Sequence, residues 1–270
     1  SNFADSGGAI WNQGDLILNN STFTKNTANV AGAIRNENTL TVTDCTFTNN
    51  SAIFSNCGTI FNILSLDGFS TGSLYCTVTN STFTSNSAEE SGGAIWNSCS
   101  VSGHASGTVI CNITECSFTG NTANNYGGAI CNSCLVYGTG TGTVNCNVTE
   151  CSFISNKAET YGGAISNRLA GSGTGSSICT ANFNRFFNNT ATTSGNAIYN
   201  NGGSVDAENN WWGINNPDND WSQFLDGVTS PTMWVQLTIN ATPDVLCVGE
   251  TSTVTANLNY NNVGQDLMAT

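Results

Sequence analysis

Residues 118–132 read Phe-Thr-Gly-Asn-Thr-Ala-Asn-Asn-Tyr-Gly-Gly-Ala-Ile-Cys-Asn. The same frame, Phe-x-x-Asn-x-Ala followed by Gly-Gly-Ala-Ile-x-Asn, recurs along most of the chain. A partial copy opens the chain at 7–12. Six fuller copies cover 23–36, 47–62, 83–97, 118–132, 153–167 and 186–200. Self-similarity at a period of roughly 20 to 50 residues is typical of a solenoid.

Apolar residues alternate ahead of each phenylalanine of the repeat. Seven residues before it stands Leu or Cys, and five residues before it stands Leu, Val, Ile or Ala. A period of two places both side chains on one face of a β-strand. The shortest repeat, from Phe23 to Phe47, is 24 residues long. We therefore predict an all-β parallel β-helix of about seven to eight coils.

Two asparagine columns follow from the stacking of coils. One closes each Gly-Gly-Ala-Ile-x-Asn block and contains Asn12, Asn36, Asn62, Asn97, Asn132, Asn167 and Asn200. The other lies in each Phe-x-x-Asn and contains Asn26, Asn50, Asn86, Asn121, Asn156 and Asn189. Stacked Asn side chains pass amide hydrogen bonds from coil to coil and satisfy turn backbone groups. We assign both columns to structure rather than to ligand binding.

All variation in repeat length falls at one corner. The distance from the second Asn to the next Phe is 11 residues in the first two repeats, 21 in the next three and 19 in the one after. Each insertion has two alternating arms and a tip rich in Gly, Ser and Thr. We predict four stacked excursions that form a fin, over 64–74, 99–109, 134–144 and 169–177. Loops on one face of a solenoid are a usual place for binding.

The repeat fades after Asn200, and one more coil is expected there. The run Asn209-Asn-Trp-Trp-Gly then supplies Trp211 and Trp212. An open solenoid end exposes sheet edges and needs a cap. We interpret the two Trp residues as that cap, with a platform for a sugar ring as the alternative.

The character of the sequence changes at Val235. The runs 235–241 and 252–258 alternate, with turn residues between them, and they predict the first two strands of an immunoglobulin-like sandwich. A sandwich needs about seven strands. We therefore divide the chain into β-helix repeats (1–203), a cap (204–231) and the incomplete start of an Ig-like domain (232–270), and we interpret it as a segment of a longer protein.

Twelve cysteines invite a disulfide or metal interpretation. Most occupy columns in which other coils carry Leu or Ser, which favours Cys as a small buried apolar residue. Two disulfides, Cys99–Cys111 and Cys134–Cys146, are open alternatives across the insertions. One histidine, His104, stands at a Gly-rich tip, so we expect no zinc site and no cofactor.

Two further sets of polar residues are candidates for a site or a modification. The column Asp44, Asn80, Glu115 and Glu150 is interpreted as solvated turn residues rather than as a Ca²⁺ site. Asn-x-Ser/Thr acceptors, which are possible N-glycosylation sites in an exported protein, occur at Asn19, Asn20, Asn49, Asn80, Asn112, Asn147, Asn188 and Asn240.

The charge balance excludes one class of partner. Five basic residues against eighteen acidic ones give a formal net charge of −13. Nucleic-acid binding needs a basic surface, so it is not expected. No apolar run approaches the roughly 20 residues that span a bilayer, so no membrane insertion is expected in this segment.

The Phe-x-x-Asn and Gly-Gly-Ala-Ile motifs resemble the repeats of chlamydial polymorphic outer-membrane proteins. Together with Asn210-Trp-Trp-Gly and the run from Val235, they are similar to adhesin-like surface proteins of methanogenic archaea. That resemblance implies a right-handed, pectin-lyase-like β-helix followed by Ig-like repeats. It also implies an extracellular protein of the cell surface or cell wall that attaches to cells, surfaces or carbohydrate. It supplies no ligand residues.

Three functional classes follow for testing. We expect a non-enzymatic adhesin, whose ligand contacts the fin or the column Trp11, Phe61, Trp96 and Tyr199, which is predicted to be exposed. The alternative is a structural subunit of a fibre, sheath or stalk, joined by contacts between neighbouring copies. A polysaccharide lyase or hydrolase is less favoured, because the arginines Arg35, Arg168 and Arg185 lie in different coils without nearby Asp pairs.

Overall fold

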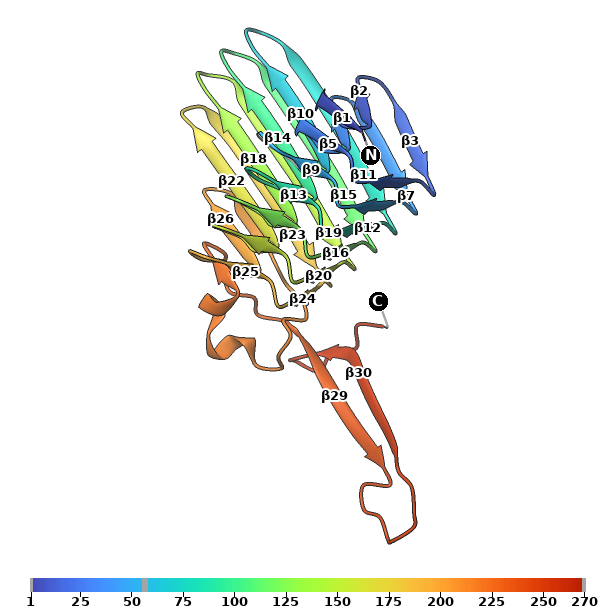
Figure 1. Ribbon diagram of the computed structural model, residues 1–270. Helices are drawn as coiled ribbons and strands as arrows, with labels where there is room; N and C mark the ends of the chain where they lie inside the picture. The colour runs from blue at the N-terminus through green and yellow to red at the C-terminus, as the bar shows by residue number, and fades with distance from the viewer. Residues whose placement is uncertain (1, 55–57, 269–270) are drawn as a thin grey trace.

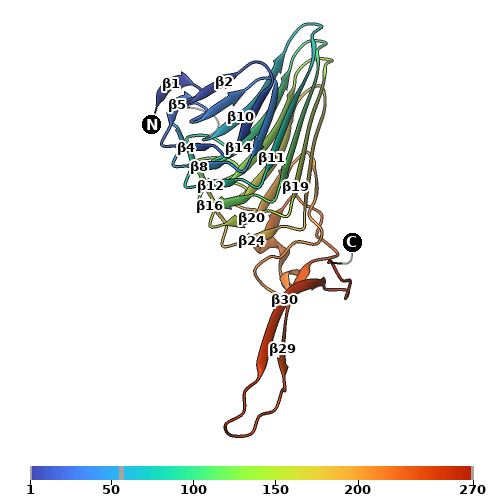
Figure 2. The same ribbon diagram turned by 90° about the vertical axis from the view of Figure 1, so that its right-hand side faces the viewer.

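The computed structural model describes residues 2–54 and 58–268. Short parallel strands stack coil upon coil into a solenoid, as Figures 1 and 2 show. The all-β parallel solenoid predicted from the repeats is confirmed. Four parallel sheets run along it, and we name each by a residue that its strands repeat.

The Ala sheet consists of β1 (Phe3–Ser6), β5 (Thr27–Val30), β9 (Ser51–Ala52), β13 (Ser87–Ala88), β17 (Thr122–Ala123), β21 (Lys157–Ala158) and β25 (Thr190–Ala191). The Ile sheet consists of β2 (Ile10–Asn12), β6 (Ile34–Asn36), β10 (Ile60–Leu66), β14 (Ile95–Val101), β18 (Ile130–Val136), β22 (Ile165–Gly171), β26 (Ile198–Asn201) and β28 (Leu225–Asp226). The Cys sheet consists of β3 (Leu16–Asn19), β7 (Thr39–Thr43), β11 (Thr71–Thr79), β15 (Ser106–Thr114), β19 (Thr141–Thr149), β23 (Thr174–Asn182) and β27 (Ser204–Asp206). The Phe sheet consists of β4 (Thr22–Thr24), β8 (Thr46–Thr48), β12 (Thr82–Thr84), β16 (Ser117–Thr119), β20 (Ser152–Ile154) and β24 (Arg185–Phe187).

The core is built from columns of identical residues. The phenylalanine rings stack face to face, with neighbouring centroids 4.8 to 5.0 Å apart and planes within 8° of parallel. That spacing follows the distance of about 4.8 Å between neighbouring strands. The Ile column and the Leu/Cys column line the same buried interior. Because each coil repeats the side chains of the last, one coil's core fits against the next.

Paired glycines let the chain approach the neighbouring coil closely. Gly92 has φ +61°, and a Cβ on Gly93 would lie 2.3 Å from the carbonyl oxygen of Gly128. No residue with a side chain fits there without a shift of backbone. The Gly-Gly before Ala-Ile is thus a packing requirement of the solenoid.

The predicted fin is confirmed. The four coils with insertions extend the Ile and Cys sheets into long paired arms, β10 with β11 through β22 with β23, and these arms rise at the top of Figures 1 and 2. Leu64, Val101 and Val136 pack between the two sheets. A Cβ on Gly107 would lie 3.0 Å from Sγ of Cys99, so glycine in the second arm sets the thinness of the fin.

Residues 207–234 close the C-terminal end of the solenoid. Trp212 continues the Phe column, and the 3-10 turns η1 (Pro217–Asn219) and η2 (Trp221–Gln223) fold beneath it. Beyond them β29 (Val235–Thr242) and β30 (Thr253–Asn261) form an antiparallel two-stranded sheet that projects away from the coils in Figure 1. The described residues contain no helix that is both long and apolar enough to cross a membrane.

Candidate binding face

The outward side of the Ile sheet gathers aromatic and arginine side chains from successive coils. Strand register places one residue of each coil in a single outward column, which runs Trp11, Arg35, Phe61, Trp96, Cys131, Ser166, Tyr199. The flanking Ile and Asn residues face the interior because side chains alternate along a strand. We call this surface the Ile-sheet face.

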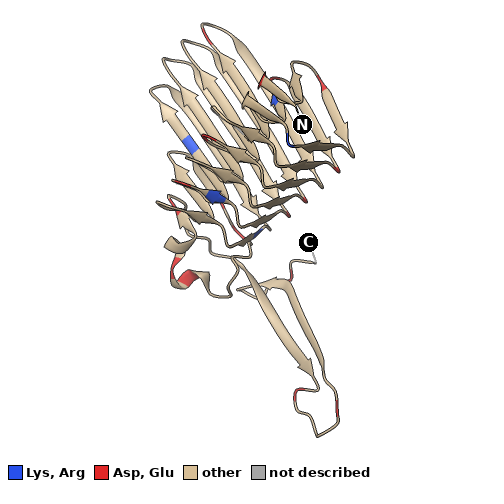
Figure 3. Ribbon diagram, in the orientation of Figure 1, with Lys and Arg blue, Asp and Glu red and all other residues tan. Residues whose placement is uncertain are grey.

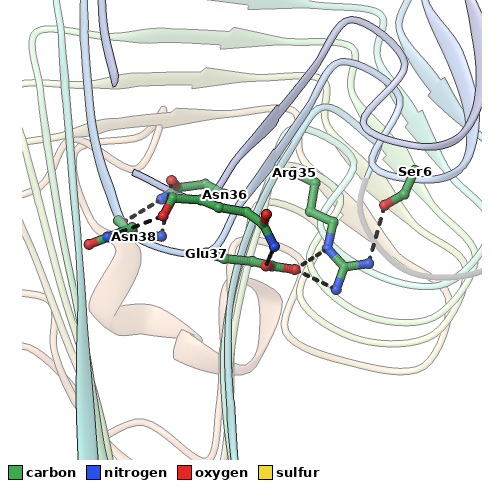
Figure 4. A network of polar contacts seen from close by, with 6 residues as sticks. Ser6, Arg35, Asn36, Glu37 and Asn38 are labelled. Carbon is green, nitrogen blue, oxygen red and sulfur yellow. Dashed lines mark hydrogen bonds and ion pairs between the residues drawn. The ribbon is translucent and has the colours of Figure 1, made fainter. Parts of the chain in front are cut away.

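At its N-terminal end the face carries a polar network around Arg35, drawn in Figure 4. The Arg35 guanidinium forms an ion pair with Glu37 at 2.7 Å and donates a hydrogen bond to Oγ of Ser6 at 3.2 Å. Gln13 donates to the other carboxylate oxygen of Glu37 at 3.0 Å. Arg35 also lies over the Trp11 ring, 5.0 Å from its centroid. A hollow of about 270 Å³ adjoins Arg35 and Glu37.

The prediction that the aromatic column is exposed along its length is wrong for its middle members. Trp11 is 54% exposed, but Phe61 and Trp96 are only 3% and 8% exposed. They form a second apolar cluster, to which Tyr126 packs from a turn before the next coil's Gly-Gly. The alternation of side chains gave the outward direction of these rings correctly, but it did not reveal that the turns fold over them.

At the C-terminal end of the face four side chains converge, which we call the Tyr–Arg cluster: Tyr126, Tyr161, Tyr199 and Arg168. The Tyr161 and Tyr199 rings stack with centroids 4.4 Å apart, and Tyr126 stacks on Tyr161 at 5.6 Å. The Arg168 guanidinium lies 3.8 Å from the centroid of the Tyr126 ring. All four side chains are half-buried.

The turns bring this cluster together. Tyr126 and Tyr161 immediately precede the Gly-Gly pair of their repeats and are joined by parallel bridges from coil to coil. Sequence analysis missed both residues as site candidates, although Tyr directly before Gly-Gly in two successive copies was a usable signal. Arg168 appears in the sequence only as an isolated arginine, because sequence spacing does not show that its guanidinium packs on the Tyr126 ring of the preceding coil.

Charged residues are sparse along the chain, as the colouring of Figure 3 shows. Among the described residues the ion pairs are Arg35–Glu37 and Lys157–Glu159, which leaves Arg168 without an acidic partner within ion-pair distance. Burial raises the pKa of Tyr199, and the nearby Tyr161, Tyr126 and Asp226 raise it further. The phenol of Tyr199 is therefore neutral at physiological pH.

The first asparagine column forms a ladder in part of its length. Nδ2 of Asn12, Asn36, Asn62 and Asn97 each donates to Oδ1 of the next member at 2.7 to 2.9 Å. The ladder then breaks, since Nδ2 of Asn132 is buried without a hydrogen-bond partner. Ser177, in place of an apolar residue of the previous coil, donates its hydroxyl to Oδ1 of Asn167 at 2.7 Å. Asn167 in turn donates to Asn200.

The second asparagine column is continuous from Asn26 to Asn189. Each Oδ1 accepts both the backbone N–H and the side-chain amide of the preceding member, at 2.9 to 3.1 Å. Each Nδ2 from Asn50 onward also donates to the carbonyl of a Phe in the preceding coil. These side chains are fully engaged in the coil stack and are not available to a ligand.

A third ladder was not foreseen from the sequence. The column lies two residues before the Phe, or before Trp212 in the last coil, and its successive members are Ser21, Cys45, Ser81, Cys116, Cys151, Asn184 and Asn210. From Cys45 onward, each side chain accepts a hydrogen bond from the backbone N–H of the preceding member. Cys, Ser and Asn share only the ability to accept a hydrogen bond. The interchange of these three residue types at one column of the sequence could have indicated this ladder.

The structure leaves the described cysteines as free thiols, Cys99, Cys111, Cys134 and Cys146 included. The two disulfides considered across the insertions are therefore not formed. The like cysteines meet between coils instead, with Cys99 in register with Cys134 and Cys111 with Cys146. Contact with the Cys134 thiol and burial both raise the pKa of Cys99. Cys57 lies outside the described residues.

The fin tip and the carboxylate column are solvated. His104 is exposed, stacks on Phe69 with ring centroids 4.8 Å apart, and makes a hydrogen bond with Thr139 at 2.5 Å. Asp44, Asn80, Glu115 and Glu150 are exposed turn residues with positive φ. The described residues contain no group of three or more His, Cys, Asp or Glu side chains that could hold a metal ion.

The N-glycosylation sequons occupy two kinds of place. Asn19, Asn20, Asn49, Asn80, Asn188 and Asn240 are exposed. Asn112 and Asn147 are half-buried on neighbouring strands of the Cys sheet, where Nδ2 of Asn147 donates to Oδ1 of Asn112 at 2.8 Å.

The two tryptophans of the cap have different environments. Trp212 is buried under the Phe column, whereas Trp211 points to the other side and lines a cleft. That cleft, of about 710 Å³, is bounded by Glu150 and Arg185 on the solenoid and by Leu258 and other residues of the C-terminal segment. It contains one carboxylate, which is fewer than glycoside hydrolysis uses.

Comparison with known proteins identifies the repeats. Residues 80–98, 115–133 and 150–168 match the model of the Chlamydia polymorphic membrane protein repeat. The matched segments each run from the carboxylate column through the Phe stack to the outward face of the Ile sheet. Neither the curated proteins nor the solved structures gave a match to the chain.

Proposed function

We propose that this chain belongs to a non-enzymatic, surface-exposed adhesin-like protein that attaches to cells, surfaces or glycans from outside the cell. The match of three successive coils to a polymorphic membrane protein repeat carries the proposal. A solenoid supports it physically, because stacked coils present long continuous faces to a partner. The Ile-sheet face, through Trp11, and the fin, through Phe69 and Tyr137, both present exposed aromatic side chains.

A structural rather than catalytic role is supported by where the acidic residues lie. The column that carries Glu115 and Glu150 is spread along exposed turns, one member to each coil. Neighbouring members lie about one strand spacing apart, but glycoside hydrolysis also needs its two carboxyl groups, about 5 to 10 Å apart, to face the same substrate bond in one cleft. The large cleft near the cap is lined by Glu150 as its one carboxylate.

Attachment can be tested with the chain itself. Beads coated with residues 1–270 are incubated with microbial cells, epithelial cells and polysaccharide particles, and the bound fraction is counted. Beads coated with heat-unfolded chain serve as the control. Retention above the control on at least one surface is expected, together with antibody labelling of intact producing cells. No retention on any surface, or labelling only after permeabilisation, would contradict the proposal.

One observation favours a second function, a subunit of a fibre or sheath. The hairpin β29–β30 has apolar side chains in solvent, with Ile239 64% and Val254 65% exposed. Within the described residues it pairs with no other sheet, and free strand edges accept further strands. Sedimentation at rising concentration tests this: a subunit assembles, and deletion of 235–261 abolishes the assembly, whereas an adhesin stays monomeric.

The finer architectural expectations are also proposals. We propose a right-handed helix of about seven to eight coils, the domain limits 1–203, 204–231 and 232–270, and an Ig-like start in the last of these. Sheets of six to eight strands support the coil count. The antiparallel pairing of β29 with β30 supports the last domain, because sandwiches are built from such pairs. A structure of a longer chain tests all three.

A further inference from the structure

We propose that the Tyr–Arg cluster is a binding subsite for a neutral hexose oligosaccharide. The inference rests on the attachment function proposed above and names its ligand class. Tyr126, Tyr161 and Tyr199 come from three successive repeats, and every pair of their ring centroids lies within 6.4 Å, so they form one compact aromatic patch for a sugar ring of the chain.

The platform for the sugar is the half-buried stack of phenol rings. Each ring is held by a neighbour, at 4.4 Å for Tyr161–Tyr199 and 5.6 Å for Tyr126–Tyr161, and keeps part of its surface in solvent. A hexopyranose has one face lined by C–H bonds and a rim of hydroxyls, and its C–H face packs on an aromatic ring. Rigid Tyr side chains lose little conformational entropy when they bind.

The polar requirement of a sugar is met by groups at the rim of the cluster. The phenol hydroxyls of its three Tyr residues and the guanidinium of Arg168 belong to half-buried side chains, which keep part of their surface in solvent. Nε of Arg168 has no hydrogen-bond partner within the described residues. Arg168 supplies donors in a fixed fork, which suits the oxygen atoms of neighbouring hydroxyls.

The electrostatic surroundings favour a neutral ligand over an acidic one. Asp226 lies close enough to raise the pKa of Tyr199, and Glu90 and Arg168 both act on the buried Cys131 thiol. Arg168 is thus one cation among acidic groups on a chain of net charge −13. A polyanionic glycan is repelled by such a field, whereas carboxylates accept hydrogen bonds from neutral hydroxyls.

The experiment uses the full chain with defined oligosaccharides. Titration calorimetry is run with cellohexaose, maltohexaose, mannohexaose and hexagalacturonate, at low and at physiological salt. Tyr161→Ala removes the central ring and Arg168→Gln removes the cation. Tyr161→Phe keeps the ring, and Tyr260→Ala is the matched control, because Tyr260 is 40% exposed on β30, outside both the Ile-sheet face and the fin. Thermal unfolding by circular dichroism is measured for each variant.

We expect at least one neutral hexaose to bind, with little dependence on salt. Tyr161→Ala should weaken its binding tenfold or more, which corresponds to about 1.4 kcal/mol. Arg168→Gln should weaken it severalfold, while Tyr161→Phe and Tyr260→Ala retain wild-type affinity. Should Tyr161→Ala unfold, Arg168→Gln and saturation-transfer contacts to the Tyr protons decide the question.

Three results would overturn the subsite: no neutral hexaose binds, hexagalacturonate binds tighter, or the variants at Tyr161 and Arg168 bind like the wild type. The bead assay separates this failure from failure of the proposed function. If wild-type and Tyr161→Ala beads attach equally, adhesion stands and the subsite is wrong. If a hexaose binds at the cluster but wild-type beads attach to nothing, the subsite stands and the adhesin proposal is wrong.

Discussion

The indole of Trp212 stacks on the ring of Phe186, with centroids 5.0 Å apart and planes 13° from parallel. The stack of phenylalanines thus ends on a larger ring in the same column. Trp221 then meets Trp212 edge to face at 5.7 Å. The cap is therefore the last coil of the repeat with a bulkier residue in the Phe position.

Replacing Trp212 by Ala should lower the free energy of unfolding by about 3 to 5 kcal/mol, because the change leaves a cavity under the last coil. Trp212→Phe should cost much less, since it keeps the stacked ring and removes the unpartnered Nε1. Urea unfolding of both variants, with Trp211→Ala as a half-exposed control, measures the difference. Equal effects of Trp211→Ala and Trp212→Ala would contradict the cap assignment.

In the second ladder, the side chain of each interior asparagine, from Asn50 to Asn156, makes four hydrogen bonds. Asn121 accepts two hydrogen bonds from Asn86 and donates to Asn156 and to the carbonyl of Phe83. Asn121→Ala leaves buried groups unpaired at about 1 to 3 kcal/mol each, so we expect loss of the folded state or a strong fall in urea midpoint. The control is Asn124→Ala, an exposed position where the change should stay within about 0.5 kcal/mol.

The turn column offers a stabilising change. Glu115 is exposed with φ +54°, a conformation that Asn and Gly adopt more readily than Glu. Its backbone N–H donates to Thr149 in the coil that also carries Glu150. Glu115→Asn should raise the free energy of unfolding by about 0.5 to 1 kcal/mol. Part of the gain should disappear at high salt, which screens repulsion between the two carboxylates; an unchanged or lower midpoint would contradict this.

Alkaline pH should destabilise the chain through its buried thiols. Burial raises the pKa of Cys131 to about 12, so the fold favours the neutral thiol. A raised folded-state pKa gives stability that is complete below the unfolded pKa near 8.5 and is lost as pH rises toward the folded value. Up to about 1.4 kcal/mol per pH unit is expected from one such group. Urea midpoints of wild type and Cys131→Ala should therefore converge between pH 8 and 11; parallel curves would contradict the assignment.

Glycan occupancy should follow the two classes of sequon. Expressed in a secretory host, the chain should carry glycans at exposed turn positions such as Asn20, Asn49 and Asn80. Asn112 and Asn147 should stay largely bare, because each lies within a strand and the two amides bond to one another. Site-resolved mass spectrometry measures this, and full occupancy at both Asn112 and Asn147 would contradict the register of the Cys sheet.

The sequence specified the interior of this molecule better than its surface. Columns such as Phe83–Phe118 and Asn86–Asn121 were predictable, because a residue that must fit the coil above and the coil below is repeated in each copy. The fin was predictable from insertion length alone. The burial of Trp96 was not, since it depends on how the turn carrying Tyr126 folds over the sheet. Contacts between a turn and a strand of another coil do not recur at the repeat period, so the sequence pattern does not reveal them.

The cysteines show the same difference between packing that could be predicted from the sequence and contacts that could not. Columns shared with Leu correctly indicated buried packing for Cys111 and Cys146. The accepting role of Cys116 and Cys151 toward backbone N–H groups depends on the path of a turn, which sequence spacing does not give. The break of the amide ladder at Asn132 similarly follows from one serine, Ser177, in an apolar column.

The strands of this solenoid lie across its long axis and each coil is bonded only to its neighbours. A pulling force applied between the two ends of the axis therefore opens one row of hydrogen bonds at a time, as in unzipping, and does not shear many rows together. Each detached coil of 35 residues, such as Phe83 to Phe118, would release roughly 120 Å of chain. Under such tension the molecule would lengthen in steps, and each step would limit the rise of the force.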